Sequence, residues 1–290
     1  MCEWIPKGEL GEKIRDIVEM LKDTSDGDCT ITLAGAHAKG LNDELSDIDI
    51  YMYYANPKPY EIQKRVVEAF ADDHEATVTT DHISTAVGGF FIFRYKGTLV
   101  EVTTRLYENA MHRIHECLDG QFEILPEDWT INGYYTFTYA SEISYVKPIW
   151  DPTDFIENTK KIIYPYSKKL KKSIIKRFGG SMNHFASYWE YQNAIKRRDL
   201  FYANHFVYRA LINMVQVIYA LNDAYYTGDK QIARKLAVLP YCPAALLANL
   251  SFLLSAPYNS AELERQRVLL SEIVDELNIK CGTLVWDEFK

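Results

Sequence analysis

Two aspartates separated by one residue, Asp47 and Asp49, are the residues whose type and spacing best suit chemistry. They open a run of aromatic and apolar residues, Ile50–Tyr54, which we predict to be a β-strand. Side chains alternate faces along a strand, so both carboxylates would point the same way and Ile48 the other way. Two neighbouring carboxylates repel each other, and Mg²⁺ is the cation that prefers oxygen ligands while keeping water and phosphate in its shell.

Small residues precede the aspartates. Thr30–Ala34 predicts a short strand, and the segment from Gly35 to Gly40 predicts a turn that carries Lys39. Glycine lets a backbone approach a ligand closely, so the N–H groups of this turn can meet an anionic phosphate. The sequence therefore predicts a phosphate site directly upstream of a metal site.

The segments around this motif predict a small mixed sheet covered by helices. We predict helices at Gly8–Leu21, Tyr60–Phe70 and Leu106–Cys117. We predict further strands at Ala76–Thr80, Gly88–Tyr95 and Thr98–Thr103, the last two joined as a hairpin by Lys96-Gly97. This order predicts an α/β (α+β) fold for a first domain, residues 1–125.

Residues 126–290 predict a second, mainly helical domain. We expect a loop at 148–152 and helices at Asp154–Phe178, Met182–Arg198, Leu200–Leu221 and Ala261–Leu277. Tyr164-Pro165 should interrupt the first of these helices, and Gly179-Gly180 should end it. The apolar character of 200–221 on nearly all sides suits the centre of a helical bundle.

The pair Gly35-Ala36, followed after a short spacer by Ser46-Asp47-Ile48-Asp49, resembles the signature of the nucleotidyltransferase superfamily of the polymerase-β type. The chain is most similar to the small-molecule, antibiotic-type members, such as aminoglycoside and lincosamide nucleotidyltransferases. The resemblance implies a third carboxylate on a later strand, and Glu101 fits because it alternates with Val100 and Val102. It also implies Mg²⁺, with two ions expected, and ATP or another nucleoside triphosphate as co-substrate.

The resemblance implies two sets of site residues. The catalytic and metal-binding set is Asp47, Asp49 and Glu101. The nucleotide-binding set is Gly35, Ala36, Lys39, Ser46 and Lys230. Ser46 could equally cap its own turn, and Lys39 and Lys230 could equally be solvated polar residues. Glu142 and Glu190 are candidates for a general base.

One position departs from the family. Ala36 stands where serine is usual, so no hydroxyl at this position can donate to a phosphate oxygen. The backbone N–H remains, and phosphate binding by the turn is still expected. The missing hydroxyl is therefore expected to affect turnover rather than phosphate binding.

The totals exclude several function classes. The chain has 290 residues and a formal net charge of −8, which argues against gripping nucleic acid by bulk charge. Its five cysteines are scattered without the spacing of a zinc site, which predicts reduced thiols and a cytoplasmic location. No apolar run approaches the roughly 20 residues of a membrane helix, so no membrane partner is expected.

We therefore expect an enzyme that transfers a nucleoside monophosphate, with AMP from ATP as the first expectation, to a hydroxyl of a small molecule. Two alternatives stay open. One is nucleotidyl transfer to RNA or to a protein, although nucleic acid is not the expected partner. The other is a nucleotide-binding regulatory or antitoxin-like protein without turnover. A monomer and a homodimer are both compatible with the sequence.

Overall fold

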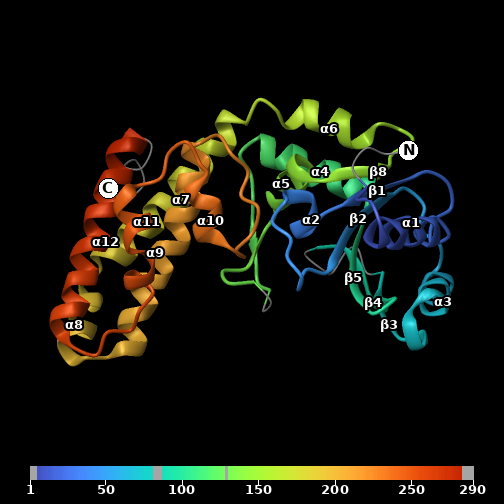
Figure 1. Cartoon of the computed structure of the whole chain (residues 1–290). Coiled ribbons are helices and arrows are strands. Elements are labelled where there is room, and N and C mark those ends of the chain that lie inside the picture. Colours follow the sequence, from blue (N-terminus) through green and yellow to red (C-terminus); the bar gives the residue numbers. More distant parts are fainter. Residues whose placement is uncertain (1–4, 81–86, 128–129, 283–290) are drawn as a thin grey trace. The chain divides into compact units, whose positions relative to one another are not determined.

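The computed structural model describes residues 5–80, 87–127 and 130–282 (Figure 1). These residues form two compact units. The first holds the described chain up to Pro165, apart from Leu118–Gln121 and Thr130–Asn132, which belong with the residues from Tyr166 onward to the second. The first unit is α/β and the second is helical, which confirms the predicted fold class. The first unit extends to Pro165, whereas we predicted the domain boundary at residue 125.

A mixed sheet forms the centre of the first unit. Within the described residues it has six strands in the order β3-β4-β5-β2-β1-β8. Their bounds are β1 Cys29–Leu33, β2 Ile48–Tyr54, β3 Ala76–Thr79, β4 Gly89–Tyr95, β5 Thr98–Leu106 and β8 Lys147–Trp150. Strands β4 and β5 form the predicted hairpin, and β5 then lies parallel to β2. This parallel pair lies in the middle of the sheet and places two strands that are distant in sequence side by side.

The edge strand β8 corrects a prediction. We expected a loop at 148–152, because two prolines bound this segment. The structure instead pairs Lys147–Trp150 antiparallel to β1, with a register irregularity between Ile31 and Thr32. Proline is compatible with an edge strand, where one row of backbone groups has no neighbouring strand to bond.

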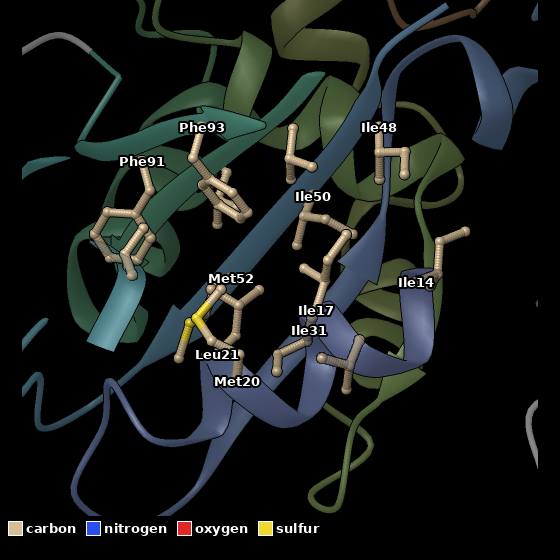
Figure 2. Packing of buried hydrophobic residues seen from close by; sticks show 14 of the residues in the cluster. Ile14, Ile17, Met20, Leu21, Ile31, Ile48, Ile50, Met52, Phe91 and Phe93 are labelled. Carbon is tan, nitrogen blue, oxygen red and sulfur yellow. The ribbon is translucent and has the colours of Figure 1, made fainter. Parts of the chain in front are cut away.

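One face of the sheet packs against helices to form an apolar core. Helices α1, Glu9–Lys22, and α3, Tyr60–Phe70, contribute to this core and confirm two predicted helices. Figure 2 shows Ile14 and Ile17 of α1 against Ile31, Ile48 and Ile50 of the sheet. Since the buried residues of β2 alternate, the intervening side chains Asp49 and Tyr51 must lie on the opposite face.

The first unit contains seven further elements in the described residues. They are α2 Gly35–Lys39, the short 3₁₀ helix Asp72–His74, α4 Tyr107–Leu118, β6 Ile124–Leu125, β7 Tyr134–Tyr135, α5 Thr138–Tyr145 and α6 Phe155–Ile163. Strands β6 and β7 pair as a separate two-stranded sheet. Helix α2 corrects the predicted turn after β1, which is a short helix. It ends at Gly40, whose φ of 66° is the left-handed conformation that glycine adopts readily at a helix C-terminus.

The second unit is built from helices. They are α7 Lys168–Ser187, α8 Trp189–Arg197, α9 Leu200–Leu221, α10 Ile232–Ala237, α11 Ala244–Leu253 and α12 Ser260–Cys281. The predicted end at Gly179-Gly180 is wrong: both glycines are buried inside α7, where packing outweighs their poor helix propensity. The predicted bounds of α9 are confirmed, and Asn259 caps α12 by accepting a bond from the Glu262 N–H. No helix in the described part of the chain has the length and apolarity to cross a membrane.

Candidate active site

Three carboxylates, on or directly before two neighbouring strands, meet on the face of the sheet opposite the apolar core. We call this the outer face. In the β2–β5 register Asp49 lies beside Glu101, and Asp47 lies two residues before Asp49 on the same face. One carboxylate oxygen from each of the three lies within 4.8 Å of the others. The two aspartates are half-buried and Glu101 is exposed. The structure thus brings together the three residues predicted as metal ligands, while their role stays a prediction.

The apolar residues between these carboxylates explain their direction. Ile48 and Ile50 are completely buried in the core, and so is Val100. Because successive side chains on a strand point to opposite faces, burying these residues sends Asp47, Asp49 and Glu101 outward together. The parallel register then sets the two strands side by side at the level of Asp49 and Glu101.

Gly35 makes room for the carboxylate of Asp49. A Cβ atom built on Gly35 would lie 1.5 Å from Asp49 Oδ2 and 2.3 Å from its Cγ, closer than any real contact. Its φ of 54° is also left-handed, which favours glycine. The adjacent backbone N–H of Ala34 donates to the Asp49 carbonyl oxygen at 2.9 Å. At this position, predicted to bind nucleotide, glycine lets α2 lie directly against a carboxylate of the cluster.

Lys39, at the end of α2, lies on an aromatic ring. Its Nζ is 4.2 Å from the ring centroid of Tyr145, the last residue of α5. The Tyr145 hydroxyl lies 3.3 Å from that of Tyr51, on β2 two residues beyond Asp49. Burial raises the pKa of both tyrosines, and the nearby charge of Asp49 adds to each shift, so both stay protonated at neutral pH.

The other predicted nucleotide-binding residues differ in their surroundings. Ala36 lies in the first turn of α2. Ser46 builds a turn with Asp43, donating from Oγ to Asp43 Oδ1 at 3.1 Å and accepting from the Asp43 N–H at 2.9 Å. Lys230 is exposed and belongs to the second unit. The turn role of Ser46, one of its two expected roles, is therefore present.

His37 adds an imidazole to the surroundings of the cluster. It lies in α2, between Ala36 and Lys39, and is half-buried. Burial lowers its pKa, and the negative charge of Asp47 opposes that shift. The imidazole is therefore neutral at pH 7, because its pKa lies below the ordinary value of 6.5.

A buried ion pair lies farther along β5. Arg105 is 2% exposed, and its guanidinium bonds both carboxylate oxygens of Glu142 on α5. It also donates to the Val87 carbonyl oxygen at 3.0 Å and to the Tyr134 hydroxyl at 3.2 Å. Glu142 was predicted as a candidate base, and this pairing corrects that prediction because a buried carboxylate bound to arginine is a poor proton acceptor.

The second candidate base lies in the helical unit. Glu190, on α8, accepts a hydrogen bond from the Tyr202 hydroxyl at 2.5 Å. Three residues of the first unit were missed by the sequence reasoning: Tyr51, Arg105 and Tyr145. Tyr51 carried a usable signal, because it continues the outward-facing alternation of Asp47 and Asp49. Tyr145 carried no such signal, since only the tertiary fold brings α5 to the strand.

Comparison with known proteins gives little beyond this geometry. No established protein family matches the sequence, and no curated protein matches it. Among solved structures, the chain is similar to a nucleotidyltransferase-like protein from Exiguobacterium sibiricum, with a TM-score of 0.44 and 11% sequence identity. The similarity covers 94% of this chain and 77% of that chain. This likeness is too low to assign a function, which has to rest on the site residues.

Proposed function

We propose that this chain is a Mg²⁺-dependent nucleotidyltransferase that moves a nucleoside monophosphate, AMP from ATP in the first instance, to a hydroxyl of a small molecule. One observation carries the proposal: three carboxylates, on or directly before the parallel strands β2 and β5, converge within 4.8 Å of one another, and none of them is fully buried. The motif resemblance of Gly35-Ala36 and Asp47-Ile48-Asp49 supports the same reaction class. A cytoplasmic location is part of the proposal.

The chemistry of this donor set fits magnesium. All three ligating groups are carboxylates, and hard divalent cations prefer oxygen. The cluster contains neither cysteine nor a ligating histidine, which zinc would favour. Asp47 and Asp49 would hold two ions between them, and Glu101 would complete the site of one ion. When bound, such ions stabilise the attacking and leaving oxygens of an in-line displacement at phosphorus.

The chain's own residues would orient the nucleotide. Because Gly35 lies against Asp49, the start of α2 would lie beside a triphosphate whose metal ions are held by the carboxylates. Lys39 brings a positive charge from the end of the same short helix, and the backbone at Ala36 offers an N–H to a phosphate oxygen. Transfer would join the α-phosphorus to the acceptor oxygen and break its bond to the bridging oxygen of pyrophosphate, which leaves, while the proton of the acceptor hydroxyl passes to solvent. The net charge of −8 suits a cationic acceptor such as an aminoglycoside.

A second candidate function has one specific observation in its favour. Ala36 removes the hydroxyl that the family places against a phosphate, so nucleotide binding without turnover is the alternative. A cluster of three carboxylates favours turnover, because a protein that only binds nucleotide does not need a site for two metal ions.

The test is pyrophosphate release. The protein is incubated with Mg²⁺ and each of ATP, GTP, CTP and UTP against aminoglycosides, lincosamides and other hydroxylated small molecules, with RNA and protein acceptors in parallel. Asp49→Asn removes one carboxylate of the cluster. Glu44→Gln is the matched control, because Glu44 is an exposed neighbour outside the cluster.

Acceptor-dependent release that Asp49→Asn abolishes and Glu44→Gln preserves would support the proposal and identify the acceptor class. Release with RNA or a protein alone would replace the small-molecule acceptor. Mg²⁺-dependent ATP binding without release from any acceptor would favour the non-catalytic alternative. Absence of nucleotide binding would contradict both.

A further inference from the structure

Three residues from three elements form a continuous link to the carboxylate cluster. The Lys39 ammonium lies over the Tyr145 ring, and the Tyr145 hydroxyl lies within hydrogen-bonding distance of the Tyr51 hydroxyl. Tyr51 follows Asp49 on the outer face of β2. The helix that ends at Lys39 begins at Gly35, against the Asp49 side chain. One end of α2 therefore lies against the cluster, and the other is linked through Tyr145 to Tyr51, two residues beyond Asp49 on the same strand.

The ring beneath Lys39 is itself held firmly. Tyr145 ends α5, and Glu142 one turn earlier in that helix forms the buried ion pair with Arg105. The Arg105 guanidinium also lies 4.0 Å from the ring centroid of Tyr139, in the first turn of the same helix. Contacts at its start, middle and end thus fix α5 to the outer face of the sheet. A ring at the end of a fixed helix can hold a flexible side chain in one place.

We propose that Tyr145 is a positioning residue that holds the Lys39 ammonium beside the carboxylates, ready for the triphosphate of a Mg²⁺–nucleotide complex. This inference rests on the proposed function. A lysine side chain has four rotatable bonds and loses conformational entropy when it is ordered against a ligand. An aromatic face attracts the ammonium without neutralising its charge, so the lysine is ordered before the nucleotide arrives.

The first test measures binding of ATP with Mg²⁺ by titration calorimetry. Tyr145→Leu should weaken binding about three- to tenfold, in line with the strength of cation–π contacts, and Lys39→Ala, which removes the charge itself, should weaken it at least as much. The double variant should be no weaker than Lys39→Ala alone, because the ring acts through the lysine. Tyr145→Phe keeps the ring and should retain most of the affinity. Unfolding midpoints of all variants separate these effects from loss of fold.

Additive losses in the double variant, or unchanged binding in Tyr145→Leu, would overturn the inference while leaving the proposed function intact. Absence of ATP binding by the unaltered protein would instead overturn the proposed function.

A nucleotide-free readout tests the geometry by itself. In a proton–carbon NMR spectrum of labelled lysines, the Lys39 side-chain methylene signals should be shifted upfield by the ring current of Tyr145. Tyr145→Leu should remove that shift and Tyr145→Phe should keep it. A Lys39 signal at the same position in the unaltered and Tyr145→Leu proteins would contradict the inference, whatever the outcome with ATP.

Discussion

Strand β5 carries two charged side chains on its outer face, and they differ in burial and in the charges around them. Glu101 is exposed and joins Asp47 and Asp49 in a cluster of a single sign. Arg105, four residues farther along, is buried with Glu142, and hydrogen bonds to the Tyr134 hydroxyl and the Val87 carbonyl oxygen add to the pairing. One strand therefore contributes to a group of three carboxylates near one end and to a buried ion pair near the other.

The different surroundings of Glu101 and Arg105 distinguish a candidate metal site from a structural ion pair. Removing a charge from water costs several kcal/mol unless an opposite charge and hydrogen bonds replace the water. The Arg105 end meets that requirement within the protein and can be fully buried. At the Glu101 end, three carboxylates converge while keeping contact with solvent, and a cation is the partner that would balance them. The comparison predicts opposite consequences for substitutions at the two ends.

The largest effect is expected at the cluster. Asp49→Asn should lower turnover by on the order of 10³-fold, because in the proposed function it removes a charge that would hold the metal at the point of reaction. The unfolding midpoint of the metal-free protein should be unchanged or higher, because one like charge is lost. Kinetics and thermal unfolding of the same preparation check both statements. A clear drop in the unfolding midpoint would show that Asp49 is structural instead.

The buried pair should show the reverse pattern. Arg105→Met should lower the free energy of unfolding by about 3–5 kcal/mol, because Glu142 is left buried without a partner. Glu101→Gln on the same strand should change it by less than about 0.5 kcal/mol. Urea unfolding of the two variants measures the difference directly. Similar losses for both would remove the distinction between the two ends of β5.

A double variant sharpens this result. Combining Arg105→Met with Glu142→Leu removes both charges, so it should be more stable than Arg105→Met alone. If the double variant were no more stable than the single one, the cost would come from lost packing around Tyr139 and Tyr134 rather than from an unpaired carboxylate.

The next effect concerns the room that Gly35 leaves for Asp49. Gly35→Ala should lower turnover by about 10²-fold, because the new methyl group displaces the carboxylate from its place in the cluster. Gly40→Ala is the matched control, since Gly40 also has a left-handed φ but a Cβ there meets nothing within 4 Å. Both variants carry a backbone cost of about 1–2 kcal/mol. Equal turnover in the two would show that the contact with Asp49 is unimportant.

The smallest effect is expected at a third kind of carboxylate, which accepts bonds from backbone groups. Asp72 bonds the N–H groups of Gly97 and Lys96 in the hairpin turn before β5, and the bond from Gly97 is the main cause of its lowered pKa. With a folded pKa below the ordinary 3.8, its contribution to stability is complete above that value and is lost as the pH falls through the folded pKa.

Asp72→Asn should therefore lower stability slightly at neutral pH, and the difference from the unaltered protein should shrink as the pH falls below 3.8. Unfolding midpoints measured across the acid range check this. A difference that grows in acid would mean that Asp72 stabilises the turn in its protonated form.

The fold was predictable where the pattern is local. Alternation revealed β2 and β5, and helical spacing revealed α1, α3 and α9. The run through Gly179-Gly180 in α7 was not predictable, because burial within the helical unit outweighs the local preference. The edge strand at Lys147–Trp150 was missed because its proline is acceptable only in the context of a sheet that the segment itself does not reveal.

The candidate site likewise has residues that a local pattern predicted and residues that only long-range contacts bring together. The directions of Asp47, Asp49 and Glu101 followed from alternation, and the hairpin brought β5 into place. The pairing of Arg105 with Glu142 joins residues 37 positions apart, and no spacing rule predicts it. Glu142 therefore stayed among the two candidates for a general base. Tyr145 was missed for the same reason, since its contact with Lys39 depends on how α5 lies on the sheet.

The most direct test of the central claim is metal binding by the carboxylate cluster itself. Mn²⁺, a paramagnetic substitute for Mg²⁺, is titrated into the protein in the presence of a non-hydrolysable ATP analogue, and bound ion is measured by electron paramagnetic resonance. We predict that the unaltered protein and Glu44→Gln bind Mn²⁺ alike and that Asp49→Asn loses most of this binding. Equal binding by all three proteins, or none by the unaltered protein, would contradict the account.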